Sequence, residues 1–240
     1  MMVKDELIQR SPARILMETI HGGLKSGELG LIASPSGIGK TSVLVQIAID
    51  KLLRGKKVIH ISFTKHTDYV LSWYENIFDE FIRKKNLDNQ DDVKTEIVKN
   101  RVLMKFNQDG LTVEQILKSL RALIKDGGFN ADALIIDGFD FCAASASRAG
   151  ENYIAAFKAF AAEMGLSIWY SCTVKGEKPY YDKRNIPLVI KDCADFFEVI
   201  IVLEPKQDHI ALTVSRNRDV YNPDHTGLKL DPRTLLILEK

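Results

Sequence analysis

Short apolar runs alternate with amphipathic stretches along most of the chain. Six of these runs are mostly unalternating and rich in β-branched or aromatic residues, which is typical of strands buried on both faces of a parallel sheet. They cover 29–33, 58–63, 102–106, 133–136, 166–170 and 199–203. We therefore predict six central strands, all or most of them parallel.

The stretches between these runs carry helical patterns. Over 69–82 apolar residues recur in pairs at four-residue spacing with charges opposite, which predicts a long helix with a wide apolar face. Thr112 and Gln115 form a capping-box pattern before a second helix, and the glycine pair 127–128 ends it. A third helix is predicted over 152–164.

The charged middle segment and the C-terminal part have different patterns. We interpret 84–99 as a solvated helix end and loop, because charge runs usually have that role. Strands at 210–214 and 228–230, separated by turn residues around 222–224, predict antiparallel hairpins at the end of the sheet. Together these patterns predict one α/β domain over 1–240, with a mainly parallel sheet flanked by helices and with 1–20 as an N-terminal extension.

Composition narrows the class of protein. A chain of 240 residues that is 45% hydrophobic can bury one large core, which excludes a disordered protein. The 33 Lys and Arg against 32 Asp and Glu leave a net charge of +1, so contact with nucleic acid would need a local basic patch. Three scattered cysteines predict a reducing, cytoplasmic setting. The charged N-terminus predicts no export, and apolar runs that fall short of the ~18 residues of a membrane span predict a soluble protein.

One loop has the residue types that bind phosphate. It follows the first predicted strand and opens a helix, as a phosphate-binding loop requires. Gly37 and Gly39 let backbone N–H groups turn inward, while Lys40 is expected to contact the β- and γ-phosphates and the Thr41 hydroxyl to ligate Mg²⁺. Ser34 replaces the first glycine of the usual pattern. The candidate binding residues are Ser34, Pro35, Ser36, Gly37, Ile38, Gly39, Lys40, Thr41 and Ser42.

A carboxylate at the end of a later strand would complete such a site. The apolar run 133–136 ends at Asp137, which is expected to hold Mg²⁺ through water. Many buried strands end in Asp at a turn, so the prediction depends on the phosphate loop that precedes it.

Two further segments have the sequence pattern of a known family of nucleotide-binding proteins. They are Gly22-Gly23-Leu24-Lys25-Ser26-Gly27-Glu28-Leu29 and Arg216-Asn217-Arg218. With the phosphate loop and Asp137, they resemble the RecA-like ATPase core of DnaB-type helicases, KaiC-type clock ATPases and RadA-type recombinases, from about Pro12 onward. The resemblance implies a RecA-like P-loop NTPase domain that binds ATP and Mg²⁺ between copies of itself in a ring or filament. It also implies that Arg216 and Arg218 act catalytically, with Lys40, on a neighbour's γ-phosphate; the alternative is that both arginines decorate an exposed edge strand.

The sequence departs from this family where the family polarises water. Thr64 occupies the position of the catalytic glutamate and Lys65 that of a second one, while His66 and Asp68 lie off the expected position as a shifted base. On the sensor strand, Ser171-Cys172-Thr173 stands where many members have a Gln or a Ser-Gln pair. Loss of a positioned base typically lowers the rate by ~10²–10⁴, so we expect weak or absent hydrolysis.

Two loops bear on nucleic-acid binding. The segment 138–145 is aromatic but lacks Lys and Arg, and 174–185 interleaves basic residues with tyrosines, as single-strand binding requires. The residues concerned are Lys175, Lys178, Tyr180, Tyr181, Lys183 and Arg184. We predict a self-assembling ATP-binding module, with two alternatives: an active DNA-dependent motor that binds single-stranded DNA, and a structural protein with a vestigial nucleotide site.

Overall fold

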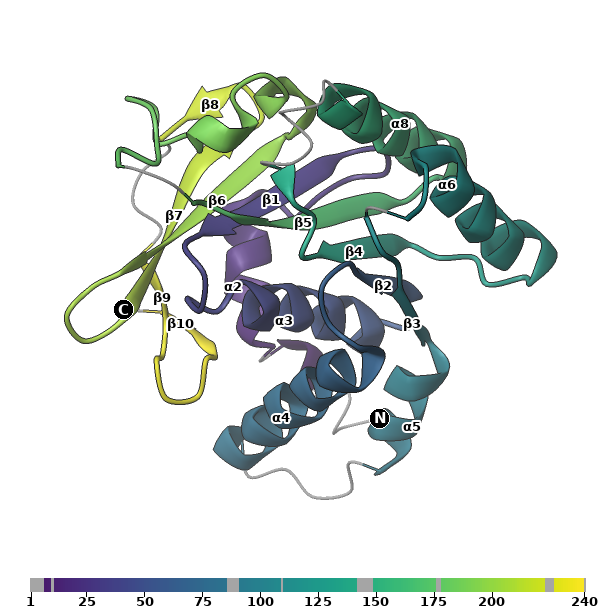
Figure 1. Cartoon of the computed structure of the whole chain (residues 1–240). Helices are drawn as coiled ribbons and strands as arrows, with labels where there is room; N and C mark the ends of the chain where they lie inside the picture. Colours follow the sequence, from purple (N-terminus) through teal and green to yellow (C-terminus); the bar gives the residue numbers. More distant parts are fainter. Residues whose placement is uncertain are drawn as a thin grey trace.

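The computed structural model describes residues 7–9, 11–85, 91–108, 110–141, 149–175, 178–222 and 227–239. A twisted sheet crosses the molecule, with helices on both of its faces (Figure 1). Its strands are β1 (Leu29–Ser34), β2 (Val58–Ser62), β3 (Arg101–Lys105), β4 (Ala133–Asp137), β5 (Ser167–Thr173), β6 (Val199–Pro205), β7 (Ile210–Asn217), β8 (Val220–Tyr221), β9 (Leu228–Leu230) and β10 (Ile237–Glu239).

The order of the strands confirms a mostly parallel sheet with an antiparallel C-terminal end. It runs β10-β9-β7-β6-β1-β5-β4-β2-β3, and β8 pairs with β7. Parallel pairing joins β6 through β1, β5, β4 and β2 to β3. The strands from β7 onward pair antiparallel. Every residue of β1, β2 and β4 is buried, which explains their unalternating apolar text.

Helices close both faces of the sheet. The α-helices are α2 (Pro12–Thr19), α3 (Lys40–Leu53), α4 (Thr67–Lys85), α5 (Asp91–Lys99), α6 (Val113–Arg121) and α8 (Ala149–Met164). The first four lie on one face, and α6 and α8 lie on the other (Figure 1). The predicted capping box before α6 is present, with Thr112 and Gln115 bonding each other's backbone. The helix continues through a π-helical segment, Ala122–Asp126, and ends at Gly127 as expected.

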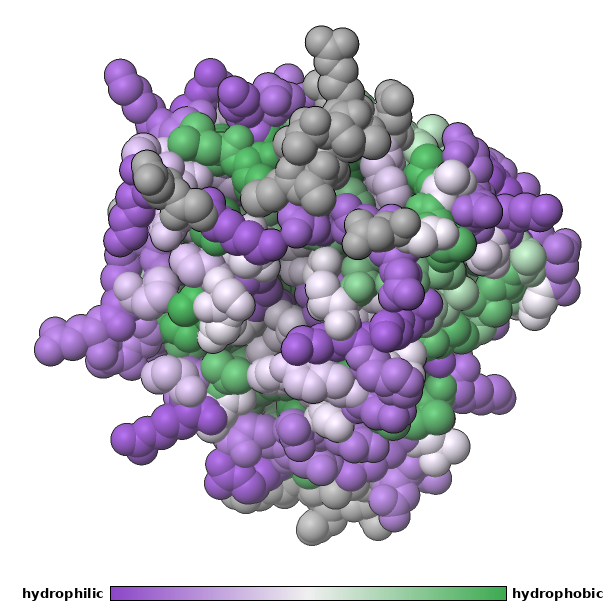
Figure 2. Space-filling view, in the orientation of Figure 1, coloured by the Kyte–Doolittle hydropathy of each residue, from purple (hydrophilic) through white to green (hydrophobic). Residues whose placement is uncertain are grey.

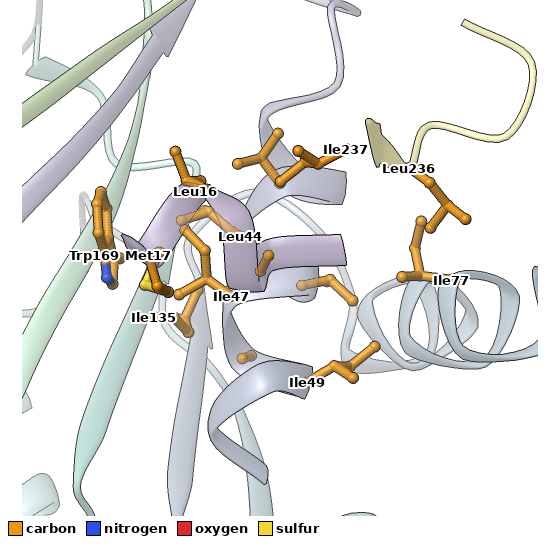
Figure 3. Close-up of a cluster of buried hydrophobic side chains, with 14 of the residues drawn as sticks. Leu16, Met17, Leu44, Ile47, Ile49, Ile77, Ile135, Trp169, Leu236 and Ile237 are labelled. Atoms are coloured by element: carbon orange, nitrogen blue, oxygen red, sulfur yellow. The ribbon is translucent and has the colours of Figure 1, made fainter. Parts of the chain in front are cut away.

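The structure adds to what was predicted for two segments. Within the predicted extension 1–20, residues 12–19 form α2, and its Leu16 and Met17 are buried in the same apolar cluster as Leu44 and Ile47 of α3 (Figure 3). The segment 84–99 is not only a helix end and loop: its second half is helix α5, which buries two apolar side chains among its charges. The patterns also missed the short strands β8 and β10.

One face of the molecule and the lengths of its helices bear on contact with a membrane. On the side seen in Figure 2 hydrophilic residues predominate, and apolar residues show in several separate patches. Within the part of the chain that the structure describes, every helix falls short of the length and apolar character needed to cross a bilayer.

Candidate functional site

A glycine loop, residues 34–39, joins β1 to α3 at the carboxyl edge of the sheet. Gly37 and Gly39 have φ of 81° and 100°, in the left-handed region that favours glycine. A Cβ on Gly39 would lie 2.6 Å from a methyl carbon of Leu230, so this position needs glycine for space as well as for conformation. The predicted glycine turn therefore exists, and it leads directly into the first turn of α3.

Lys40 lies folded against this loop. Its Nζ donates to the carbonyl oxygens of Pro35 and Ser34, at 2.8 and 3.1 Å, and to the Ser34 hydroxyl at 3.3 Å. Burial lowers the pKa of Lys40 to about 8, against the attraction of Cys172 and Asp137. A largely buried cation with neutral oxygen partners is a favourable site for an anion, which would restore the lost solvation.

Thr41 and Asp137 meet although they are far apart in the chain. The Thr41 hydroxyl donates to Oδ2 of Asp137 at 2.8 Å, and the Ser171 hydroxyl donates to Oδ1 at 2.5 Å. Asp137 is only 7% exposed. The strands β1, β5 and β4 are neighbours and parallel, so their carboxyl ends bring these groups to one edge, as the sequence predicted.

A cavity of about 730 Å³ opens over these groups. Its volume is in the range of small-molecule sites. The residues that line it are Ser36, Gly37, Gly39, Lys40, Thr41, Thr64, Lys65, Tyr69, Trp73, Asp137, Gly138, Phe139, Asp140, Ser171, Thr173, Val174, Lys175 and Leu235. Most of the predicted loop therefore faces the cavity.

Some predicted binding residues have other contacts instead. Ser34 and Pro35 act behind the loop, where they hold Lys40. Ile38 packs against the apolar core on the α3 face. Ser42 is fully buried, and its hydroxyl donates to the Leu235 carbonyl at 2.7 Å, so its side chain anchors the β9–β10 connection.

The oxygen donors suit Mg²⁺ only in company with a ligand. Among the described residues no group of three or more His, Cys, Asp or Glu could hold a metal ion. Thr41 and Asp137 supply one hydroxyl and one carboxylate. Mg²⁺ typically takes one or two protein oxygens and completes its shell with water and substrate phosphates, so this pair fits a phosphate-bound Mg²⁺.

Thr64, the residue at the expected position of the catalytic base, lies in the wall of the cavity. Thr64 lies so close to Gly138 that a Cβ there would be 2.5 Å from Oγ1 of Thr64. His66 and Asp68, the shifted candidates, pair with each other at 3.1 Å with highly exposed side chains, and neither lines the cavity. Of its carboxylates, Asp137 faces Thr41, and Asp140 pairs with Lys175 at 3.0 Å.

Two aromatic residues of α4 were not predicted as part of the site. The pattern placed Trp73 on an apolar helix face, where it does pack against the core, but it also lines the cavity with Tyr69. Tyr69 is 46% exposed, and the Lys65 ammonium lies 5.3 Å above its ring. Their position depends on where α4 begins, and the periodicity did not fix that residue.

Arg216 and Arg218 lie at the opposite end of the strands. The Arg218 amide donates to the carbonyl of Glu198, which precedes β6, whereas the glycine loop follows β1, a parallel neighbour. Six residues at ~3.3 Å each separate Glu28, which Arg218 contacts, from Ser34, a span of about 20 Å. Neither arginine can therefore reach its own chain's loop. Both are also engaged within the chain, so action on a neighbour's nucleotide stays a prediction.

The proposed nucleic-acid loop is only partly available. Tyr181 has a buried hydroxyl, and burial raises its pKa to about 12. Arg184 lies 4.9 Å above the Tyr221 ring, and Lys175 pairs with Asp140. Lys178, Tyr180 and Lys183 remain as surface groups, while 142–148 and 176–177 lie outside the described residues.

No family model matches the chain, and no curated protein matches it in sequence.

Proposed function

We propose that this chain is a RecA-like P-loop protein that binds ATP with Mg²⁺ in the cavity over the glycine loop. The observation that carries the proposal is the convergence of Lys40, Thr41 and Asp137 at one edge of a parallel sheet. The lysine supplies positive charge for phosphate oxygens, and the start of α3 adds the positive end of a helix dipole. The hydroxyl and the carboxylate supply two oxygens for the metal.

We further propose that hydrolysis is weak or absent. At the position expected for a base the cavity wall has Thr64, which cannot accept a proton from water at neutral pH, and the neighbouring Lys65 is a cation. Nucleotide binding depends on the glycine loop, Lys40 and Asp137. A threonine in place of a catalytic glutamate at residue 64 leaves all of these groups in place. A protein that binds ATP without hydrolysing it quickly could act as a module whose assembly or partner binding depends on whether the nucleotide is bound.

Assembly with copies of the same chain is part of the proposal. The glycine loop and the arginine pair lie at opposite edges of the sheet, so a head-to-tail arrangement would bring one copy's loop toward the next copy's arginines. Such heterologous contacts generate rings or filaments. The placement supports this arrangement, and sedimentation with and without nucleotide tests it.

Lys40→Ala tests the nucleotide site. Because a hydrogen bond to a charged group contributes about 1.5–3 kcal/mol, the variant should bind a fluorescent ATP analogue with Mg²⁺ about 10–100-fold more weakly. Lys99→Ala, an exposed lysine of α5, is the matched control and should bind like the parent. Equal binding by Lys40→Ala and the parent would refute the assignment.

A further inference from the structure

Ser171 links the two strands that end at the candidate metal site. Its side chain is buried at 2% exposure within β5. The hydroxyl donates to Oδ1 of Asp137 at 2.5 Å and accepts from the Gly138 amide at 2.8 Å. One hydroxyl thus contacts both the carboxylate and the first backbone amide that follows it.

These contacts leave the hydroxyl little freedom. A serine hydroxyl has a single hydrogen, which here points at Asp137, while the Gly138 N–H occupies a lone pair. Thr41 donates to the other carboxylate oxygen, Oδ2. The carboxylate is therefore held at both of its oxygens, and each oxygen keeps acceptor capacity for a further partner.

We propose that Ser171 is a positioning residue that orients Asp137 toward Mg²⁺. This inference rests on the proposed function, since it concerns the metal that accompanies the nucleotide. When bound, the metal would supply positive charge between Asp137, Thr41 and the phosphates. Ser171 lines the cavity together with Thr173, but its hydroxyl hydrogen is donated to the carboxylate, so it acts on the metal through Asp137.

The same strand provides a matched comparison. Ser167 also lies in β5 and is also 2% exposed, but its hydroxyl has no hydrogen-bond partner among the residues that the structure describes. If Ser171 mattered only as a small buried side chain of β5, replacing either serine by alanine should have the same effect. The difference between them is the bond to Asp137, so replacement of each by alanine separates positioning from packing.

The experiment measures binding of a fluorescent ATP analogue, first in EDTA and then across a Mg²⁺ titration. Partners that orient a metal ligand typically contribute about 10–100-fold in metal affinity, so Ser171→Ala should raise the half-maximal Mg²⁺ concentration about 10-fold or more. Its affinity in EDTA should match that of the parent. Ser171→Thr, which keeps the hydroxyl, should restore most of the Mg²⁺ response, and Ser167→Ala should leave it unchanged.

Three results would overturn the inference. An unchanged Mg²⁺ response in a folded Ser171→Ala variant shows that Asp137 needs no such partner. An equal loss of affinity in EDTA and in Mg²⁺ shows that the residue shapes the loop and not the metal site. A shift of the same size in Ser167→Ala shows that packing of β5 is responsible. If the parent binds no nucleotide at all, the proposed function fails, and this inference fails with it.

Discussion

Arg218 is predicted to stabilise its own subunit through contacts with the segment before β1. All five of its N–H groups have acceptors, a geometry that the short side chain of alanine cannot reproduce. Two bonds reach the carboxylate of Glu28, at 2.8 and 3.1 Å, and the others reach the Gly23 carbonyl, the Asn217 side chain and the Ile20 carbonyl. Arg218→Ala removes this entire set.

The size of the effect follows from the exposure of the pair. The side chains of Arg218 and Glu28 are 24% and 16% exposed, so the pair is partly buried. Exposed ion pairs contribute about 0–1 kcal/mol to stability, and breaking a buried pair costs about 3–5 kcal/mol. Glu28 keeps one acceptor bond, from the Lys25 amide. We therefore expect a loss of about 2 kcal/mol in the free energy of unfolding. For a chain of this length that corresponds to a fall of about 4–8 °C in melting temperature.

Urea denaturation of the parent, Arg218→Ala, Glu28→Ala and the double variant measures the coupling of the pair. A coupling energy of about 1–2 kcal/mol is expected, and Arg233→Ala, an exposed arginine near the C-terminus, should change stability by less than about 0.5 kcal/mol. Full stability of Arg218→Ala with no coupling to Glu28 would refute the structural role. Arg218 would then be free to act on a neighbour's nucleotide.

Two further predictions concern charge. The folded pKa of Lys40, about 8, lies below the 10.5 of an unfolded lysine, so the unfolded chain binds more protons between these pH values and the free energy of unfolding should rise with pH there. In urea titrations the parent should gain about 2–3 kcal/mol from pH 8 to 10.5 relative to Lys40→Met. Parallel plots of stability against pH for the two proteins would contradict the burial of the cation. If the chain binds single-stranded DNA, Lys178→Ala with Lys183→Ala should lower the slope of log affinity against log salt by about 1.4. Lys175→Ala with Arg184→Ala should change this slope less, because Lys175 is ion-paired with Asp140 and Arg184 lies over the Tyr221 ring. The reverse ranking in fluorescence anisotropy would place DNA elsewhere.

The central sheet could be predicted because its strands are buried on both faces. Such strands have continuous apolar text, and each of the six predicted runs overlaps an observed strand. The carboxyl ends of parallel strands meet at one edge, so a glycine loop after one strand and Asp137 after another had to come together. For that reason the sequence predicted that Thr41 and Asp137 would lie near one another, and the structure adds a direct hydrogen bond between them.

Other features depend on contacts that local patterns do not contain. Helix α2 spans only two turns, too short for periodicity to distinguish a core helix from an extension, and its burial depends on α3. Arg218 contacts Glu28 across 190 residues of sequence. Ser171 was visible only as a departure from a sensor pattern, because its partner lies on a neighbouring strand. The short strand β10 pairs with β9, and Leu235 in the connection between them has a φ of 56°. Leucine rarely adopts this left-handed conformation, so the residue types of the connection do not predict the turn.

The weak hydrolysis that we propose is predicted to depend on Thr64. If Lys40, Thr41 and Asp137 already position the metal and the γ-phosphate, then a carboxylate at residue 64 should orient the attacking water. Thr64 is exposed and borders the cavity, so a longer side chain can extend into the open space. Thr64→Glu should therefore raise steady-state ATP hydrolysis by about 10-fold, less than the ~10²–10⁴ of an optimised base, because Lys65 lies beside the new charge.

Thr64→Gln is the matched control, since it has the same length and no charge, and it should leave the rate unchanged. An equal increase in both variants would assign the effect to shape and not to proton transfer. A parent that already turns over at ~1 s⁻¹ or faster, and that slows on Thr64→Glu, would contradict the assignment of the base position. Asp140 would then be the first residue to replace, because among the described residues it is the carboxylate that lines the cavity besides Asp137, and release from Lys175 would leave it able to accept a proton. That outcome would favour the DNA-dependent motor over the slow nucleotide-binding module.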